Sequence, residues 1–137
     1  GIPYIAFDTN QARVAEFSSL GHPVFYGDVT NLDLLVAAHI EKVDLVVLTL
    51  DDREDALHAA TLIRDLAPNT IIVARARDLD ASDALLRAGV NKAFPEALEA
   101  SLRLAAEALE CLGIAGEDTD MLVRGVRRSD YALVREE

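Results

Sequence analysis

Short apolar runs alternate with helix-length segments along most of this chain. Nearly continuous hydrophobic runs of this length are typical of parallel strands that are buried on both faces of their sheet. They predict strands over residues 3–8, 23–26, 44–50 and 70–75, and a short strand around residues 93–94. The segments between them predict helices over residues 11–20, 31–39, 53–66, 80–88 and 95–112. We therefore expect an α/β fold, a three-layer sandwich with helices on both faces of a mostly parallel sheet.

The helix expected over residues 95–112 begins with a proline, which suits a first helical turn, and carries an apolar stripe. Its members are spaced by three and four residues: Leu98, Leu102, Ala105, Leu109 and Leu112. The stripe indicates either packing against the helix's own sheet or a contact in a dimer. Because Gly113 and Gly116 break the pattern, we expect a domain over residues 1–113 and a C-terminal tail over residues 114–137.

Composition narrows the functional classes. The formal net charge of −11 argues against a nucleic-acid surface, because phosphate binding needs clustered Lys and Arg. No apolar stretch approaches the roughly 18 residues that a spanning helix needs, so we expect no membrane insertion of this chain. No secretion leader opens the sequence, and the single cysteine, Cys111, fits a reducing compartment. The tail has three arginines that neutralise the chain's own acids, or dock on the domain or on a membrane partner: Arg124, Arg127 and Arg128.

Three of the apolar runs end in an aspartate: Asp8, Asp28 and the pair Asp51-Asp52. Open α/β sheets bind ligands at the carboxyl ends of their strands, so these carboxylates lie where a ligand is expected. Asp8 at a strand tip can accept hydrogen bonds from both ribose hydroxyls of an adenine nucleotide. The alternative is that Asp8 or Asn10 caps the helix that follows.

The second of these strand ends reads Gly27-Asp28-Val29-Thr30. Glycine lets the backbone turn and approach a ligand closely. Asp28 can then accept the exocyclic amine of adenine while Val29 packs on the ring. The alternative is a turn followed by a helix cap at Thr30 or Asn31.

The third and fourth strand ends carry charges of both signs. Asp51 and Asp52 repel each other, so they bind a cation, face a ligand or start the next helix, and the last role is favoured for Asp52. Arg75 and Arg77 follow the fourth run, where a guanidinium can bind phosphate or a ligand carboxylate. The alternative is a salt bridge to a neighbouring acid: Asp78, Asp80 or the aspartates at the other strand ends.

The sequence shows no catalytic set and no metal site. The histidines lack metal-ligand spacing, and Cys111 has no His or basic neighbour that would activate it. A nicotinamide-dependent oxidoreductase would need a Tyr-x-x-x-Lys or His-based set, which is absent. We therefore expect neither an enzyme nor a bound metal.

The loop Gly-x-Gly-x-x-Gly, which holds the pyrophosphate in dinucleotide-binding folds, is also absent. In the doubly wound strand order 3-2-1-4-5-6, the strand before this loop lies in the middle of the sheet. Its loss would leave two apolar strand edges unpaired. Either the chain is a fragment, or a partner supplies the strand, or the sheet order differs.

Several strings of residues resemble the TrkA-N family, also called RCK (regulator of potassium conductance), and in particular its Kef-type potassium efflux members. The strings are Ala6-Phe7-Asp8, Val24 to Thr30, Asp51-Asp52 and Ile72 to Asp78, and the resemblance covers nearly the whole chain. It implies a Rossmann-like α/β domain that lacks its first βα unit. It also implies a regulatory domain that senses NAD(H) or AMP, with affinity weakened by the missing loop, and controls a potassium or cation:proton antiporter.

The same resemblance implies partners and a location. Such domains pair as homodimers and pass the ligand state to a membrane antiporter domain. The implied location is cytoplasmic, as the soluble domain of an inner-membrane transporter. In glutathione-regulated members, basic residues near the dimer seam receive glutathione or its adducts, so glutathione-type gating is a further expectation.

By motif match, the resemblance implies a set of nucleotide-binding residues: Asp8, Thr9, Asp28, Val29, Thr49, Leu50, Asp51 and Arg75. Within this set Asp8 would hold the ribose, and Asp28 with Val29 would line the adenine pocket. Arg75 and Arg77 would face the ligand or the dimer seam.

A phospho-receiver-like signalling domain, with sheet order 2-1-3-4-5, is the alternative interpretation. Asp51 would then accept the phosphoryl group, Asp8 would bind a metal ion, and Lys92 would pair with the phosphate. The two interpretations differ in strand pairing. Direct pairing of the Asp8 strand with the Asp51 strand favours the receiver, whereas a gap between them favours the truncated Rossmann half.

Overall fold

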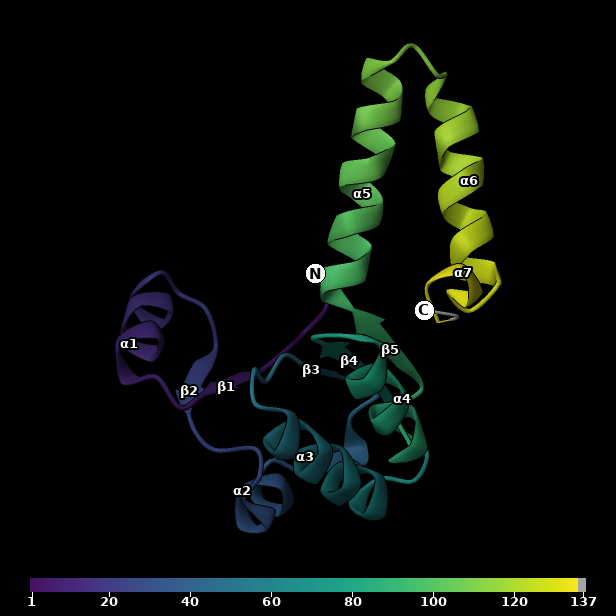
Figure 1. Ribbon diagram of the computed structural model, residues 1–137. Helices are drawn as coiled ribbons and strands as arrows, with labels where there is room; N and C mark the ends of the chain where they lie inside the picture. Colours follow the sequence, from purple (N-terminus) through teal and green to yellow (C-terminus); the bar gives the residue numbers. More distant parts are fainter. Residues whose placement is uncertain (136–137) are drawn as a thin grey trace.

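The computed structural model describes residues 1–135, and its strands form two parallel sheets (Figure 1). In the smaller sheet, β1 (Ala6–Asp8) pairs with β2 (Val24–Tyr26). In the larger sheet, β4 (Ile71–Ala76) lies between β3 (Leu45–Leu48) and β5 (Lys92–Pro95). The predicted α/β fold with parallel strands is confirmed.

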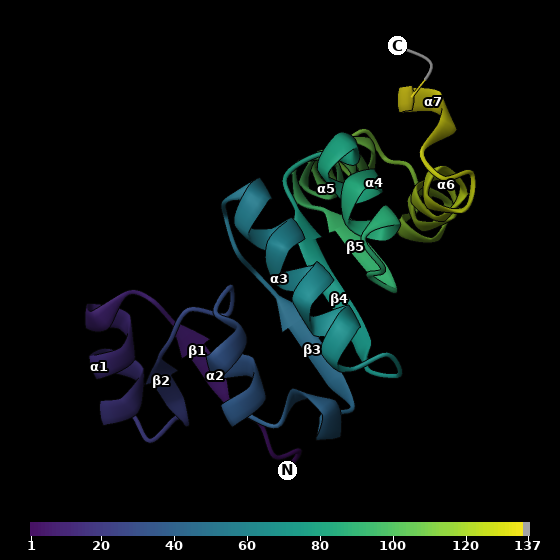
Figure 2. The same ribbon diagram turned by 90° about the horizontal axis from the view of Figure 1, so that it is seen from below.

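β1 and β3 do not pair with each other within residues 1–135. Figure 2 shows their arrows pointing the same way, with β2 beyond β1 and β4 beyond β3. The receiver-like alternative required direct pairing of β1 and β3, and the described residues do not make it. The order β2-β1, a gap, then β3-β4-β5 is that of a doubly wound sheet without its middle strand.

Side-chain caps begin four of the helices. The side chains of Asn10, Asn31, Asp52 and Asp78 each accept a backbone N–H from the first turn of the following helix, which otherwise has no intrahelical partner. These helices are α1 (Gln11–Ser19), α2 (Leu32–Ala37), α3 (Arg53–Leu66) and α4 (Leu79–Arg87). A short 3-10 turn, η1 (Ile40–Lys42), leads into β3. The capping roles predicted for Asn10 and Asn31 and the helix-start role of Asp52 are therefore observed.

The hydrophobic core lies between the larger sheet and the helices α3 and α4, which cover one of its faces (Figure 2). Side chains alternate along β4, so Ile72, Ala74 and Ala76 are buried. The other face carries apolar side chains that are more than half exposed: Leu45, Val47, Ile71 and Phe94. α1 packs against β1 and β2 on the side away from α2 (Figure 1). Helices thus lie on both sides of the strands, and one face of β3-β4-β5 stays open.

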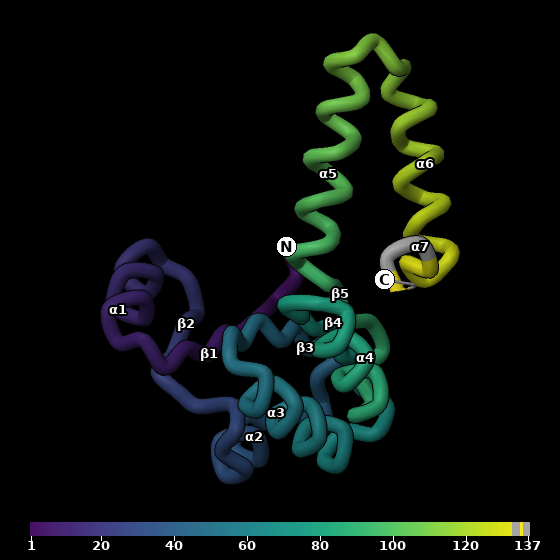
Figure 3. Tube along the Cα trace, in the orientation of Figure 1, coloured from purple at the N-terminus to yellow at the C-terminus, as the bar shows by residue number. Residues whose placement is uncertain are grey.

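The C-terminal helices form an arm that leaves the sheet and turns back, as the trace in Figure 3 shows. They are α5 (Glu96–Cys111), α6 (Gly116–Arg128) and α7 (Ala132–Arg135). The buried Glu99 carboxylate of α5 accepts hydrogen bonds from Arg127 and Tyr131. Arg135 lies 2.7 Å from the Asp83 carboxylate of α4. The segment expected as a tail therefore contains the helices α6 and α7 and docks on its own domain, and residues 136–137 lie outside the described part.

Candidate functional site

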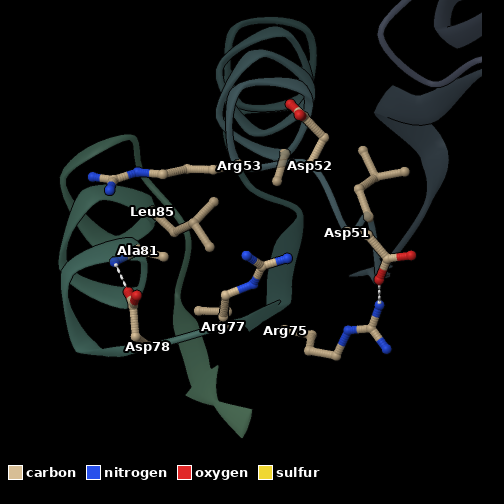
Figure 4. Close-up of a pocket in the computed structure, with 11 residues that line it drawn as sticks. Asp51, Asp52, Arg53, Arg75, Arg77, Asp78, Ala81 and Leu85 are labelled. Atoms are coloured by element: carbon tan, nitrogen blue, oxygen red, sulfur yellow. Dashed lines mark hydrogen bonds and ion pairs between the residues drawn. The ribbon is translucent and has the colours of Figure 1, made fainter. Parts of the chain in front are cut away.

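Two adjoining pockets open at the carboxyl ends of β3 and β4, the sheet edge at which a ligand is expected. One pocket, of ≈ 360 Å³, lies between the starts of α3 and α4 (Figure 4). The other, of ≈ 470 Å³, lies beside the first turn of α5. Residues shared by both linings are Leu50, Asp51, Arg75, Ala76 and Arg77. All of these except Ala76 are predicted site residues, so the structure brings four of the predicted residues together.

Three acceptors hold Arg75 in place. Its Nη2 donates to the carboxylate of Asp51 and, at 2.8 Å, to the carbonyl oxygen of Thr49. Its Nε lies 3.5 Å from Oε2 of Glu96. The salt-bridge alternative for Arg75 is therefore observed, with Asp51 as the main partner. Because the Asp51 side chain is 86% exposed, this pair is weak and an anionic ligand can compete for the guanidinium.

The guanidinium of Arg77 has neither a hydrogen bond nor an ion pair within residues 1–135, and only the backbone carbonyl of this residue accepts a bond, from the N–H of Ala97 at 3.3 Å. Figure 4 shows its guanidinium pointing into the space between α3 and α4, and Arg53 lines the same pocket from the start of α3. Asp52 and Asp78 also line this pocket. Each uses a carboxylate oxygen to cap a helix, with a 2.9 Å bond from the N–H three residues further on. The pocket therefore presents an uncommitted guanidinium beside two helix starts.

Asp8 lies at the tip of β1, and its carboxylate contacts the first turn of α1. Oδ1 accepts the backbone N–H of Asn10 at 2.8 Å and Nη2 of Arg13 at 3.2 Å, while Oδ2 lies 2.9 Å from Nε of Arg13. The Asn10 N–H, together with the Arg13 guanidinium, lowers the pKa of Asp8 from its usual value. Asn10 rather than Asp8 caps α1, so Asp8 remains a strand-end carboxylate, with the exposed Thr9 next to it.

Asp28 follows β2 on the neighbouring strand. Its Oδ1 accepts the hydroxyl of Thr30 at 2.6 Å and the Thr30 N–H at 2.9 Å, and these bonds lower the pKa of Asp28. Its Oδ2 has no hydrogen-bond partner among the described residues. The N–H of Gly27 donates to the carbonyl oxygen of Asp8 at 3.1 Å, which ties the two strand ends together. Val29 is half-buried and packs against the core.

The predicted nucleotide-binding residues therefore fall into two groups. Leu50, Asp51 and Arg75 line the pockets, and Thr49 contributes a carbonyl oxygen to Arg75. The other group lies at the ends of β1 and β2 and lines neither pocket: Asp8, Thr9, Asp28 and Val29. The unpaired edges of β1 and β3 separate the two groups.

Sequence reasoning missed three contacts of this site: Arg13 on Asp8, Glu96 beside Arg75, and Arg53 in the pocket lining. The contact of Arg13 with Asp8 could have been predicted from the position of Arg13 relative to the helix cap. With Asn10 as the cap, Arg13 occupies the third helical position, and its N–H donates to the Asn10 side chain. A long cation at that position can reach back to the strand tip. For Glu96 and Arg53, the sequence offered only their places in a first helical turn.

Two further findings concern residues 1–135 as a whole. No group of three or more His, Cys, Asp or Glu side chains in this part of the chain is arranged to hold a metal ion. None of its helices combines the length and the apolar character needed to cross a membrane.

Comparison with known proteins agrees with this architecture. The family model of the TrkA-N domain matches residues 1–96. The chain is 32% identical over 136 residues to the putative K(+) efflux antiporter KefB of Alkalimonas amylolytica. It is 31% identical over 136 residues to the glutathione-regulated potassium-efflux system protein KefC of an Escherichia coli O157:H7 strain. These alignments cover 99% of this chain but 21% and 22% of the relatives, so the chain spans about a fifth of their length.

A solved structure extends the agreement to three dimensions. The Shewanella denitrificans Kef CTD in AMP-bound form is 26% identical, with a TM-score of 0.74, and the match covers 96% of this chain and 95% of that chain. The parallel strand order with its gap and the charged strand ends are consistent with a Rossmann-like domain of this kind. This chain belongs to the TrkA-N domain family, and the potassium efflux antiporters KefB and KefC are among its close relatives.

Proposed function

We propose that this chain is a cytoplasmic regulatory domain that senses an adenine nucleotide and controls a Kef-type potassium or cation:proton antiporter. The placement of Asp8 and Asp28 carries the proposal: they follow two adjacent parallel strands and are tied together by the Gly27–Asp8 backbone hydrogen bond. Carboxylates at this edge of an α/β sheet are suited to ribose hydroxyls and to the adenine amine. The expected output is a change in the membrane domain rather than a chemical reaction.

The residues present fit the adenosine part of such a ligand better than its phosphates. The Oδ2 of Asp28 is free among the described residues, while Thr30 occupies Oδ1 and fixes the carboxylate. The backbone N–H groups of a Gly-x-Gly-x-x-Gly loop, which would hold a pyrophosphate, do not come from this chain. Arg75 lines both pockets at the ends of β3 and β4, and we propose it as the cation that meets the phosphates. We propose AMP or NAD(H) as the ligand, and the AMP-bound Kef relative supports AMP.

Isothermal titration calorimetry of the protein in its full natural length, with AMP, NAD and NADH, tests this proposal. Asp8→Asn and Asp28→Asn should each weaken binding by about tenfold, because each removes a charged hydrogen-bond acceptor. Asp65→Asn is the matched control, since Asp65 is exposed on α3 and should leave the affinity unchanged. Failure of all three nucleotides to bind would contradict the proposal.

We also propose that the chain works as a homodimer. The open face of the larger sheet supports this, because Leu45, Val47, Ile71 and Phe94 expose a contiguous apolar surface that a second copy would cover. Val47→Lys should shift sedimentation from dimer to monomer. Val36→Lys, on the exposed side of α2, is the control and should leave the dimer intact.

Glutathione is a second proposed ligand. The KefC relative is named as glutathione-regulated, and the uncommitted guanidinium of Arg77 suits a peptide that carries two carboxylates. Arg77→Gln should weaken binding of glutathione adducts while AMP binding is kept. If the wild type and Arg77→Gln bind the glutathione adduct with equal affinity, Arg77 does not take part in binding it.

A further inference from the structure

The side chain of Arg13 holds the carboxylate of Asp8 in a fork. Its Nε lies 2.9 Å from Oδ2 and its Nη2 lies 3.2 Å from Oδ1, so each guanidinium nitrogen meets a different oxygen. The N–H of Asn10 adds a third donor at 2.8 Å from Oδ1. The carboxylate proposed to accept the ribose hydroxyls is therefore already engaged on both of its oxygens.

This pair can be opened by a ligand. The Arg13 side chain is 56% exposed and the Asp8 side chain 28%, so water can replace either partner. Within residues 1–135, the Arg13 side chain makes no hydrogen bond or ion pair with any other residue. The backbone N–H of Arg13 contributes to the cap of α1, and this bond does not involve the guanidinium. The guanidinium can therefore turn from Asp8 toward a ligand without breaking a structural contact.

We propose that Arg13 is a specificity-determining residue of the ribose site, and that it allows the site to bind adenine nucleotides with a phosphate on the ribose 2′ position. This inference rests on the proposed function, since it assumes that Asp8 meets the ribose. A ribose with a free 2′-hydroxyl must compete with Arg13 for Asp8. A 2′-phosphate instead gives the guanidinium an anionic partner that it can bind through two hydrogen bonds.

The net charge of the site determines whether it accepts a 2′-phosphate, and this separates an Asp–Arg pair from an aspartate alone. An unpaired carboxylate at this position repels a 2′-phosphate and selects the free hydroxyl. The Asp8–Arg13 pair has no net charge, so that repulsion is largely cancelled before the ligand arrives. The sequence thus combines the acidic residue of hydroxyl-selective sites with the arginine of phosphate-accepting sites, five positions apart.

The test compares 5′-AMP with adenosine 2′,5′-bisphosphate, which differ only in the 2′-phosphate, by calorimetry on the protein in its full natural length. For the wild-type protein the two dissociation constants should agree within about tenfold. Arg13→Gln should tighten 5′-AMP binding and weaken bisphosphate binding, so that their ratio changes by at least about tenfold. Arg13→Lys keeps the positive charge but lacks the forked guanidinium. Its ratio of the two dissociation constants should lie between those of the wild type and Arg13→Gln. Arg124→Gln on α6 removes the same charge far from Asp8 and should leave the ratio unchanged (Figure 1).

The outcomes separate the two claims. If neither nucleotide binds to the wild-type protein, the proposed function and this inference fail together. If 5′-AMP binds and Asp8→Asn weakens it, but Arg13→Gln leaves the ratio of the two constants unchanged, only the role of Arg13 is overturned. A wild-type preference for 5′-AMP of more than about a hundredfold would also overturn it.

Discussion

The guanidinium of Arg64 on α3 donates two hydrogen bonds to the carbonyl oxygen of Gly89, from Nε at 3.0 Å and from Nη2 at 2.8 Å. Its other bonds reach further acceptors around the amino ends of β4 and β5: the carbonyl oxygens of Ala67, Pro68 and Thr70 and the side-chain oxygen of Asn91. Asn91 also accepts the N–H of Ile72 at 2.8 Å. One side chain thus joins the end of α3 to the starts of two strands, at the sheet edge opposite the candidate site.

Arg64→Met should therefore lower the free energy of unfolding by about 2–4 kcal/mol, because it removes the side-chain donors of the partly buried carbonyl oxygens of Gly89 and Thr70. Urea unfolding followed by circular dichroism measures this loss. Arg87→Met, at an exposed position in the last turn of α4, is the matched control and should change stability by less than about 0.5 kcal/mol. Equal losses in both variants would show that Arg64 acts only through its aliphatic stem.

The strands and helices of this fold were predictable because the spacing of apolar residues along the chain indicates which side chains are buried. The strands and the first five helices follow from apolar runs and from cap residues such as Asn10 and Asp52. Two strand bounds differ by more than one residue: β1 begins at Ala6, three residues after the predicted start, and β3 ends at Leu48, two residues before the predicted end. The contacts of Arg64 with Gly89 and of Glu99 with Arg127 were not predictable, because these partners lie 25 and 28 residues away in the chain. The sequence after residue 113 is polar, so no apolar pattern predicted α6, which packs against α5 and contacts it through Arg127 and Glu99.

The same distinction applies to the candidate site. Topology alone places Asp8 and Asp28 at one sheet edge, so the sequence was enough to locate them. What each carboxylate contacts depends on side-chain conformation, and the bonds from Arg13 and Thr30 are set by the helix and turn that follow. The division of the predicted residues into two groups depends on the unpaired edges of β1 and β3, which no local pattern shows.

The docking of α6 should depend on pH through Glu99. Hydrogen bonds from Arg127, and then from Tyr131, lower the pKa of the buried Glu99 carboxyl from its usual value of 4.5. A lowered folded-state pKa stabilises the fold above that usual value, and the stabilisation is lost as pH falls through the folded-state pKa. Arg127→Gln should therefore cost about 1–3 kcal/mol near neutral pH and progressively less below about pH 4.5. Chemical unfolding of both proteins at a series of pH values measures the difference.

Arg124→Gln is the control for this pH dependence, since Arg124 is exposed on the same helix. Its difference from the wild type should stay small and constant over the acid range. If Arg127→Gln loses the same free energy of unfolding at every pH, the docking of α6 does not depend on the ionisation of Glu99.

Tyr131 should report the same contact from the alkaline side. Burial, together with its 2.6 Å hydrogen bond to Glu99, raises the pKa of its phenol to about 12. The raised folded-state pKa means that this contribution is present below the usual value of 10.0 and is lost as pH rises through about 12. Ultraviolet titration should show a tyrosine with this late transition, absent in Tyr131→Phe and shifted to lower pH in Glu99→Gln. An identical titration in Glu99→Gln would contradict the role of the carboxylate.

Gly27 lies in a tightly packed place beside the two strand ends that carry Asp8 and Asp28. A Cβ at this position would lie 2.8 Å from Cδ2 of Leu34 and 3.0 Å from Cδ1 of Phe7, closer than carbon atoms approach in a packed interior. Gly27→Ala should therefore cost about 1–3 kcal/mol, since Leu34 and Phe7 must both shift. Gly125→Ala is the matched control, because a Cβ there meets nothing within 4 Å and α6 gains about 0.5–1 kcal/mol from the better helix former. Thermal unfolding of the two variants should therefore move in opposite directions, and parallel shifts would show that Leu34 and Phe7 adapt without cost.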